Sequence, residues 1–176
     1  MPFEVEFFFD QVHADRIQDV WSQMSDHGFG VEMTGRPHVT LAIWDQIDLG
    51  VAQDWLREFA MELQPFPIRF ASVGLFARPQ SVIFLTPVVT GNLLEIQELF
   101  RTNFRGRIGE SWSNFRPGWW VPHCTLTQGI ERESLPGALA LASEIELPFV
   151  AEVNSIGIVE FPSITDHCTF PLGIRT

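Results

Sequence analysis

The sequence predicts an α+β fold in which antiparallel strands form the sheet and helices cover its outer faces. Two observations predict this class: segments of strand and helix periodicity alternate along the chain, and the second half repeats the order of the first. The chain has 176 residues, 45% of them hydrophobic, which suffices for one packed domain over residues 1–176.

The elements follow from hydrophobic spacing and from helix-capping and helix-breaking residues. We expect strands over 3–9, 35–44, 68–76, 81–86, 119–127, 149–160 and 167–172. We expect helices from Asp10 to His27-Gly28, from Asp48 or Gly50 to Pro65, over 91–104 and over 132–145. The apolar stripes are Ile17, Val20, Trp21 and Met24 in the first helix, Val51, Trp55, Phe59 and Leu63 in the second, and Leu94, Ile96, Leu99 and Phe100 in the third. Residues 105–118 break the pattern and predict a long functional or mobile loop.

An internal repeat organises these elements. A strand with His-x-Thr, a helix, a proline break and a strand ending in a Gly-apolar pair occur in each half, so that Val73-Gly74-Leu75-Phe76 corresponds to Ile156-Gly157-Ile158-Val159. The repeat predicts two lobes related by a pseudo-two-fold axis, with a central cleft between them.

The most informative residues are two tripeptides, His38-Val39-Thr40 and His123-Cys124-Thr125, each preceded by proline and followed by leucine. In a strand, residues two apart point to the same face, so each tripeptide presents an imidazole beside a hydroxyl. Displacement at phosphorus needs a general base and a general acid, and two imidazoles can divide these tasks. His38 and His123 are therefore the candidate catalytic residues.

Thr40 and Thr125 are the candidate phosphate ligands, because their hydroxyls can donate to the non-bridging oxygens where charge grows. This chemistry requires no metal and no cofactor. No carboxylate stands beside either tripeptide in the sequence, which argues against a metal centre there. A third match, His167-Cys168-Thr169, lacks the proline and is read as a coincidence, with Asp166 and His167 in a hairpin turn.

Aromatic and basic residues supply candidates for substrate binding. The aromatic candidates for stacking a base are Phe8, Trp44, Phe76, Trp119 and Trp120. The candidate cations for a phosphate are Arg78, in the hairpin turn, and Arg105, Arg107 and Arg116, in the long loop.

Composition limits the partners. The net charge is −11 and every basic side chain is arginine, so long duplex nucleic acid is not expected, whereas a small nucleotide or a short RNA end is compatible. No run of about 18 apolar residues occurs and the first residues lack the form of a signal peptide, so we expect a soluble cytoplasmic protein without a membrane span. Oligomeric state stays open.

With both tripeptides placed, the chain resembles the two-histidine (2H) phosphoesterase superfamily, in particular its 2′-5′ RNA ligase and cyclic phosphodiesterase group. The resemblance rests on His38-Val39-Thr40-Leu41 and His123-Cys124-Thr125-Leu126 and covers nearly the whole chain. It implies a cleft lined by both histidines and both threonines, and a metal-independent hydrolysis of a 2′,3′-cyclic phosphate or a related small phosphodiester. The alternatives are a 2′-5′ RNA ligase or RNA end-processing enzyme and a non-catalytic nucleotide-binding module. Natural substrate, regiochemistry and the roles of the two histidines stay open.

Overall fold

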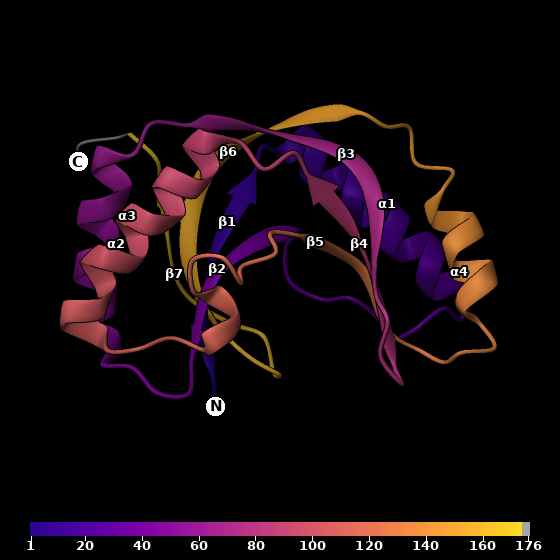
Figure 1. The fold of residues 1–176 in the computed structure, drawn as a ribbon, viewed down its shortest axis with the longest axis horizontal. Coiled ribbons are helices and arrows are strands. Elements are labelled where there is room, and N and C mark those ends of the chain that lie inside the picture. The colour runs from indigo at the N-terminus through magenta and orange to yellow at the C-terminus, as the bar shows by residue number, and fades with distance from the viewer. Residues whose placement is uncertain (174–176) are drawn as a thin grey trace.

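The computed structural model describes residues 1–173, which form one seven-stranded antiparallel sheet and its covering helices (Figure 1). The strands are β1 (Phe3–Phe9), β2 (His38–Trp44), β3 (Phe66–Phe76), β4 (Ser81–Pro87), β5 (Cys124–Ile130), β6 (Phe149–Glu160) and β7 (Thr165–Pro171). The helices are α1 (Gln11–Asp26), α2 (Leu49–Glu62), α3 (Gly91–Ile108), the short 3₁₀ helix η1 (Ser113–Phe115) and α4 (Leu135–Ala142). The α+β prediction is confirmed.

The sheet is strongly arched. Its strand order is β2-β1-β6-β3-β4-β5, with β7 paired to β6. Although β2 and β5 end this order, they lie side by side in the middle of the molecule (Figure 1). The indole N–H of Trp120, just before β5, donates to the Thr40 carbonyl of β2 at 3.0 Å and ties the two edges together. This curvature brings both tripeptides to one place.

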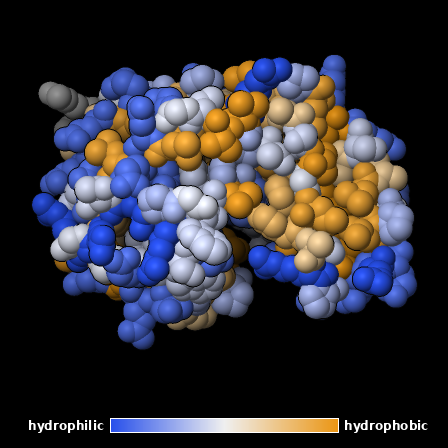
Figure 2. Space-filling view, viewed as in Figure 1, coloured by the Kyte–Doolittle hydropathy of each residue, from blue (hydrophilic) through white to orange (hydrophobic). Residues whose placement is uncertain are grey.

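The helices stand in two pairs, α2 with α3 and α1 with α4, at opposite ends of the sheet (Figure 1). Figure 2 shows polar side chains gathered on the side of α2 and α3, apolar side chains gathered on the side of α4, and a hollow between the two sides. None of the helices of residues 1–173 is long and apolar enough to cross a membrane. Because the strands form a single sheet, the division into two lobes stays a prediction.

The core between the sheet and α2 and α3 is aromatic. Phe100 and Phe104 are buried and their rings lie 4.3 Å apart, with Trp44 within 6.2 Å of each. Burying a phenyl side chain stabilises a fold by roughly 1.5–3 kcal/mol, so this cluster anchors the helices to β2.

Two helices differ from their predicted faces. In α2 the buried residues are Ala52, Leu56, Phe59 and Ala60, and Val51 is exposed, because the stripe facing the sheet is set one position further along the chain. In α3, Leu94 and Leu99 are exposed, and the buried stripe is Leu93, Ile96, Gln97, Phe100 and Phe104. Phe104 extends that stripe and carries the helix to Ile108, so the predicted loop begins later than expected.

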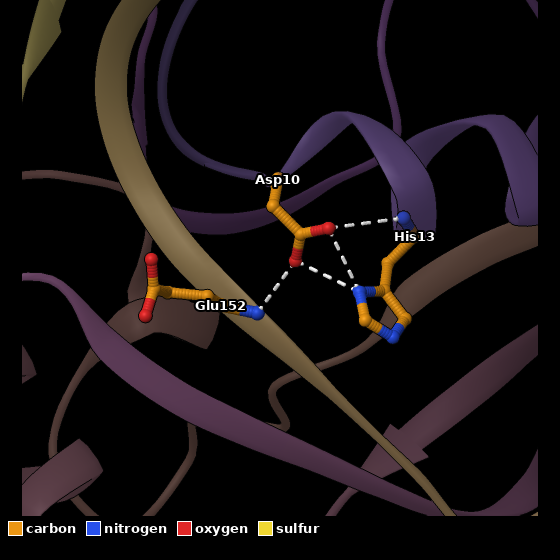
Figure 3. Close-up of polar contacts among 3 residues, drawn as sticks. All are labelled: Asp10, His13 and Glu152. Atoms are coloured by element: carbon orange, nitrogen blue, oxygen red, sulfur yellow. Dashed lines mark hydrogen bonds and ion pairs between the residues drawn. The ribbon is translucent and has the colours of Figure 1, made fainter.

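The start of α1 is fixed to the sheet by Asp10, as Figure 3 shows. Its carboxylate accepts from the backbone N–H of His13 at 3.2 Å and from that of Glu152 on β6 at 2.8 Å, and it contacts the His13 ring nitrogen Nδ1. Partial burial opposes ionisation, but these hydrogen bonds outweigh it and lower the pKa of Asp10. The predicted helix cap is confirmed, and it also joins the helix to β6.

Candidate active site

Both tripeptides line one cavity of about 730 Å³ beside the junction of β2 and β5. His38, Thr40, His123 and Thr125 all contribute to its wall. The intervening Val39 and Cys124 are fully buried on the opposite face, as strand alternation predicts. Burial raises the pKa of the Cys124 thiol to about 12, so this side chain acts as a buried apolar group.

The backbone carbonyl of the residue before each proline orients the ring of the histidine that follows. The Nδ1 atom of His38 lies 2.8 Å from the Arg36 carbonyl oxygen, and Nδ1 of His123 lies 2.7 Å from the Val121 carbonyl oxygen. A carbonyl only accepts, so Nδ1 carries the hydrogen in both rings. Nε2 is therefore the ring nitrogen left free to accept or donate a proton in each case.

Two carboxyl groups from β1 stand beside the first tripeptide, which corrects the expectation that none would. Glu4 and Glu6 lie on the same face of β1, and Glu6 is paired with Thr40 across the strands. The Oε1 atom of Glu6 lies 3.4 Å from Nε2 of His38, and the Thr40 hydroxyl donates to Oε2 of Glu4 at 3.2 Å. No carboxylate is near either tripeptide along the chain, and these two come from an adjacent strand.

Glu6 is 3% exposed, and this burial is the main reason why its pKa lies well above the ordinary value. The charge of Glu4 and a hydrogen bond between the two carboxyl groups raise it further, while the Arg36 guanidinium opposes the shift. Burial therefore favours the neutral acid form of Glu6.

Glu4, Glu6 and His38 together could hold a cation. One ligand atom from each lies within 4.8 Å of the other two, and two carboxyl oxygens with one imidazole nitrogen suit a divalent metal. The raised pKa of Glu6 works against such binding, because a ligating carboxyl group must lose its proton. Metal independence thus stays a prediction.

The surroundings of His123 are aromatic instead. The Phe76 ring packs edge-on at 4.9 Å between centroids, and the Phe84 ring lies at 5.2 Å. Phe84 is paired with Thr125 across β4 and β5, the relation that Glu6 has to Thr40 across β1 and β2. Burial lowers the pKa of His123, and the charges of His38 and Arg78 act in the same direction against the hydrogen bond to Val121.

Four of the six predicted substrate-binding residues line the cavity: Phe76, Arg78, Trp119 and Trp120. Trp119 is 76% exposed at the rim, free to stack on a ligand. The other two predictions are wrong. Trp44 is buried against Phe100 and Phe104, and Phe8 is buried beneath the Arg36 guanidinium, 3.5 Å from its ring centroid.

Arg78 is the one arginine in the cavity wall of residues 1–173. Arg105 instead pairs with Glu110 at 2.7 Å, and Arg107 lies over the Trp55 ring. Both belong to the last turn of α3, where their positive charges interact favourably with the helix dipole. Arg116 is exposed and lies outside the cavity wall.

Sequence reasoning missed Trp112 and Glu32, which also line the cavity. The Trp112 indole donates to Asp45 at 3.0 Å, which fixes this part of the 109–123 segment to the end of β2. The concentration of tryptophans in 112–120 was the available signal.

The third tripeptide lies outside the cavity wall. His167 is on β7 and not in a turn, so the predicted turn is wrong. Its Nε2 lies 2.9 Å from Oε2 of Glu160 on β6, which gives this ring a structural partner.

Comparisons with known proteins agree with this fold. The family model described as the 2′-5′ RNA ligase superfamily matches residues 9–163. Among solved structures, TT0787 of Thermus thermophilus is similar with a TM-score of 0.69 and 17% identity, covering 98% of each chain. LigT of Escherichia coli in the apo form has a TM-score of 0.64 and 14% identity, covering 97% of this chain and 96% of that one. Usb1 of Kluyveromyces marxianus, solved with uridine monophosphate, has a TM-score of 0.54 and 11% identity, covering 97% and 98%. No curated protein sequence matches the chain.

Proposed function

The chain belongs to the 2′-5′ RNA ligase superfamily, and on that premise we propose that it is a metal-independent phosphodiesterase that opens a 2′,3′-cyclic phosphate or a related small nucleotide phosphodiester. One observation carries the proposal: two histidines, each with Nδ1 held by a carbonyl, share one cavity with two threonine hydroxyls. A general acid, a general base and two oxygen-stabilising donors are the groups that this displacement needs.

The unequal surroundings of the histidines support different roles for them. His123, whose pKa is lowered among phenyl rings, is the base that takes a proton from the attacking water. His38 is the acid, because Glu6 beside its Nε2 can resupply the proton that the ring donates.

In the reaction, the water oxygen forms a bond to phosphorus while one ribose oxygen leaves. The water proton passes to His123, and the leaving oxygen takes a proton from His38. Thr40 and Thr125 donate to the non-bridging oxygens, whose charge grows in the transition state. The product is a nucleoside monophosphate.

The cavity supports a ligand of nucleotide size. Its volume of about 730 Å³ lies within the usual range for small-molecule sites. Solved structures with this fold contain 3′-AMP, ATP and uridine monophosphate. A wall with one arginine, in a chain of net charge −11, suits a short phosphodiester better than an extended RNA backbone.

The test is hydrolysis of the four nucleoside 2′,3′-cyclic phosphates by the purified protein in excess EDTA. We expect turnover of at least one substrate, with His38→Gln and His123→Gln each nearly inactive. Turnover that EDTA abolishes and a divalent metal restores would refute the metal-independent mechanism. Binding of nucleotides without any product would instead favour the binding module, and salt-sensitive affinity for RNA fragments would favour RNA end processing.

A further inference from the structure

We infer that Glu4 makes the phosphate end of the cavity selective for singly charged phosphodiesters over doubly charged phosphomonoesters. The inference rests on the proposed function, since it assumes that phosphate binds at Thr40. It adds a charge filter that distinguishes the substrate of the reaction from its product.

Glu4 lies close to the place where Thr40 would bind a phosphate oxygen. The Thr40 hydroxyl lies 3.2 Å from Oε2 of Glu4. A phosphate oxygen that accepts a hydrogen bond from Thr40 would lie about 2.7 Å from the same hydroxyl oxygen, and therefore within about 6 Å of the Glu4 carboxylate. No side chain needs to move for the two groups to come this close.

The second step is competition for one proton. Thr40 has a single hydroxyl hydrogen, and the structure directs it to Glu4. To bind phosphate, the hydroxyl must turn from the carboxylate to the ligand. Glu4 thus opposes anion binding through its charge and through its hold on this donor.

The third step is the charge around the pair. Glu6 is buried beside this pair, and its Oε1 atom lies 3.4 Å from Nε2 of His38. The groups that face Glu6 from other strands are His38 on β2, Arg36 just before it and Asp166 on β7. Arg36 is already bound to Asp166 at 3.1 Å and to the Thr169 hydroxyl at 2.7 Å. It is therefore committed to β7 and not available to a ligand.

The cation at the other side of the cavity is Arg78, at the turn between β3 and β4. Its guanidinium balances one negative charge, which is the charge that a phosphodiester carries. A phosphomonoester carries close to two charges at pH 8, because its second pKa is about 6. Apart from the two histidines, the cavity wall of residues 1–173 holds no further cation, and the second charge meets the Glu4 carboxylate.

This preference would favour release of the product after turnover. Ring opening converts a singly charged cyclic phosphate into a doubly charged monoester, and Glu4 then weakens the binding of the product. At about 6 Å and with the screening typical of partly buried sites, one additional charge corresponds to roughly 10- to 100-fold in affinity.

The experiment is calorimetric binding of a nucleoside 3′-monophosphate and of its singly charged methyl ester, at pH 8 and pH 5.5 in EDTA. For the unmodified protein we expect the methyl ester to bind at least about tenfold more tightly at pH 8. The preference should largely vanish at pH 5.5, where both ligands carry about one charge. Comparing two ligands at each pH cancels the effect of histidine protonation on overall affinity.

Three variants locate the effect. Glu4→Gln should bring the affinity ratio at pH 8 close to one, by strengthening monoester binding. Glu6→Gln, which retains the Glu4 charge, should keep the preference. Glu160→Gln is the matched control, because its carboxylate also pairs with a histidine but lies outside the cavity wall.

Equal binding of both ligands by the unmodified protein at pH 8 would overturn the inference even if no variant folded. A preference for the methyl ester that persists in Glu4→Gln would also overturn the inference. The same holds for monoester binding that a divalent cation strengthens only when Glu4 is present. In these cases hydrolysis of cyclic phosphates would leave the proposed function standing. Failure of both ligands to bind, together with absent hydrolysis, would refute the proposed function and the inference with it.

Discussion

Gly74 on β3 controls the position of the aromatic wall behind His123. It is paired with Phe84 on β4, and a Cβ atom added at Gly74 would lie 2.6 Å from Cζ of the Phe84 ring and 2.8 Å from the Thr86 hydroxyl. Carbon atoms in contact normally lie about 3.5–4.0 Å apart, so the ring would have to move by roughly 1 Å. Phe84 is buried and packs against the rings of Phe76 and His123, so a displaced ring would press on both of them.

We therefore expect Gly74→Ala to destabilise the protein and to reduce turnover. Overpacking of a buried contact costs about 1–3 kcal/mol. The backbone works the other way, because alanine in a strand is favoured over glycine by about 0.5–1 kcal/mol. The net loss in the free energy of unfolding should be about 1–2 kcal/mol. A shift of about 1 Å beside a catalytic group can reduce turnover on the order of 100-fold.

Urea denaturation measures the first effect and hydrolysis of a cyclic phosphate the second. Gly106→Ala is the control, because this helical glycine has nothing within 4 Å of the added Cβ and should gain about 0.5–1 kcal/mol. Combining Gly74→Ala with Phe84→Leu removes the clash with the ring and leaves only the contact with the Thr86 hydroxyl, so the alanine should cost less in that background. A Gly74→Ala protein that is as stable and as active as the unmodified one would refute the reasoning.

Three further predictions concern the histidines. His38→Gln should reduce turnover about 10²–10⁴-fold, which is the usual contribution of an acid–base group. His167→Gln should remain active, because it loses only its contact with Glu160. Equal losses in steady-state assays would show that the wrong histidine was assigned. Because burial lowers the pKa of His123, the acid limb of the kcat/KM profile should fall below about pH 6.5, and a limb above that value would contradict its role as the base. The same shift means that stability is fully present above about pH 6.5 and is lost as pH falls through the lower folded-state value, so His123→Gln should flatten this loss in urea titrations.

Much of the site could be predicted because it depends on local geometry. Strand alternation places His38 beside Thr40 and His123 beside Thr125 whatever the strands pair with, and the helix caps and prolines mark where the elements begin and end. The buried faces of α2 and α3 were harder to predict, because several sets of apolar residues have helical spacing. Which set is buried depends on the surface that the helix packs against.

By itself, the sequence determined which residues share a strand face, and hence the two imidazole–hydroxyl pairs. Only the tertiary structure decided that the edges of the sheet meet, that Glu4 and Glu6 stand beside His38 while Phe84 stands beside His123, and that Trp44 belongs to the core. The physical reason is that strand pairing joins residues distant along the chain. Its register is set by the packing of the whole sheet, which no local periodicity records.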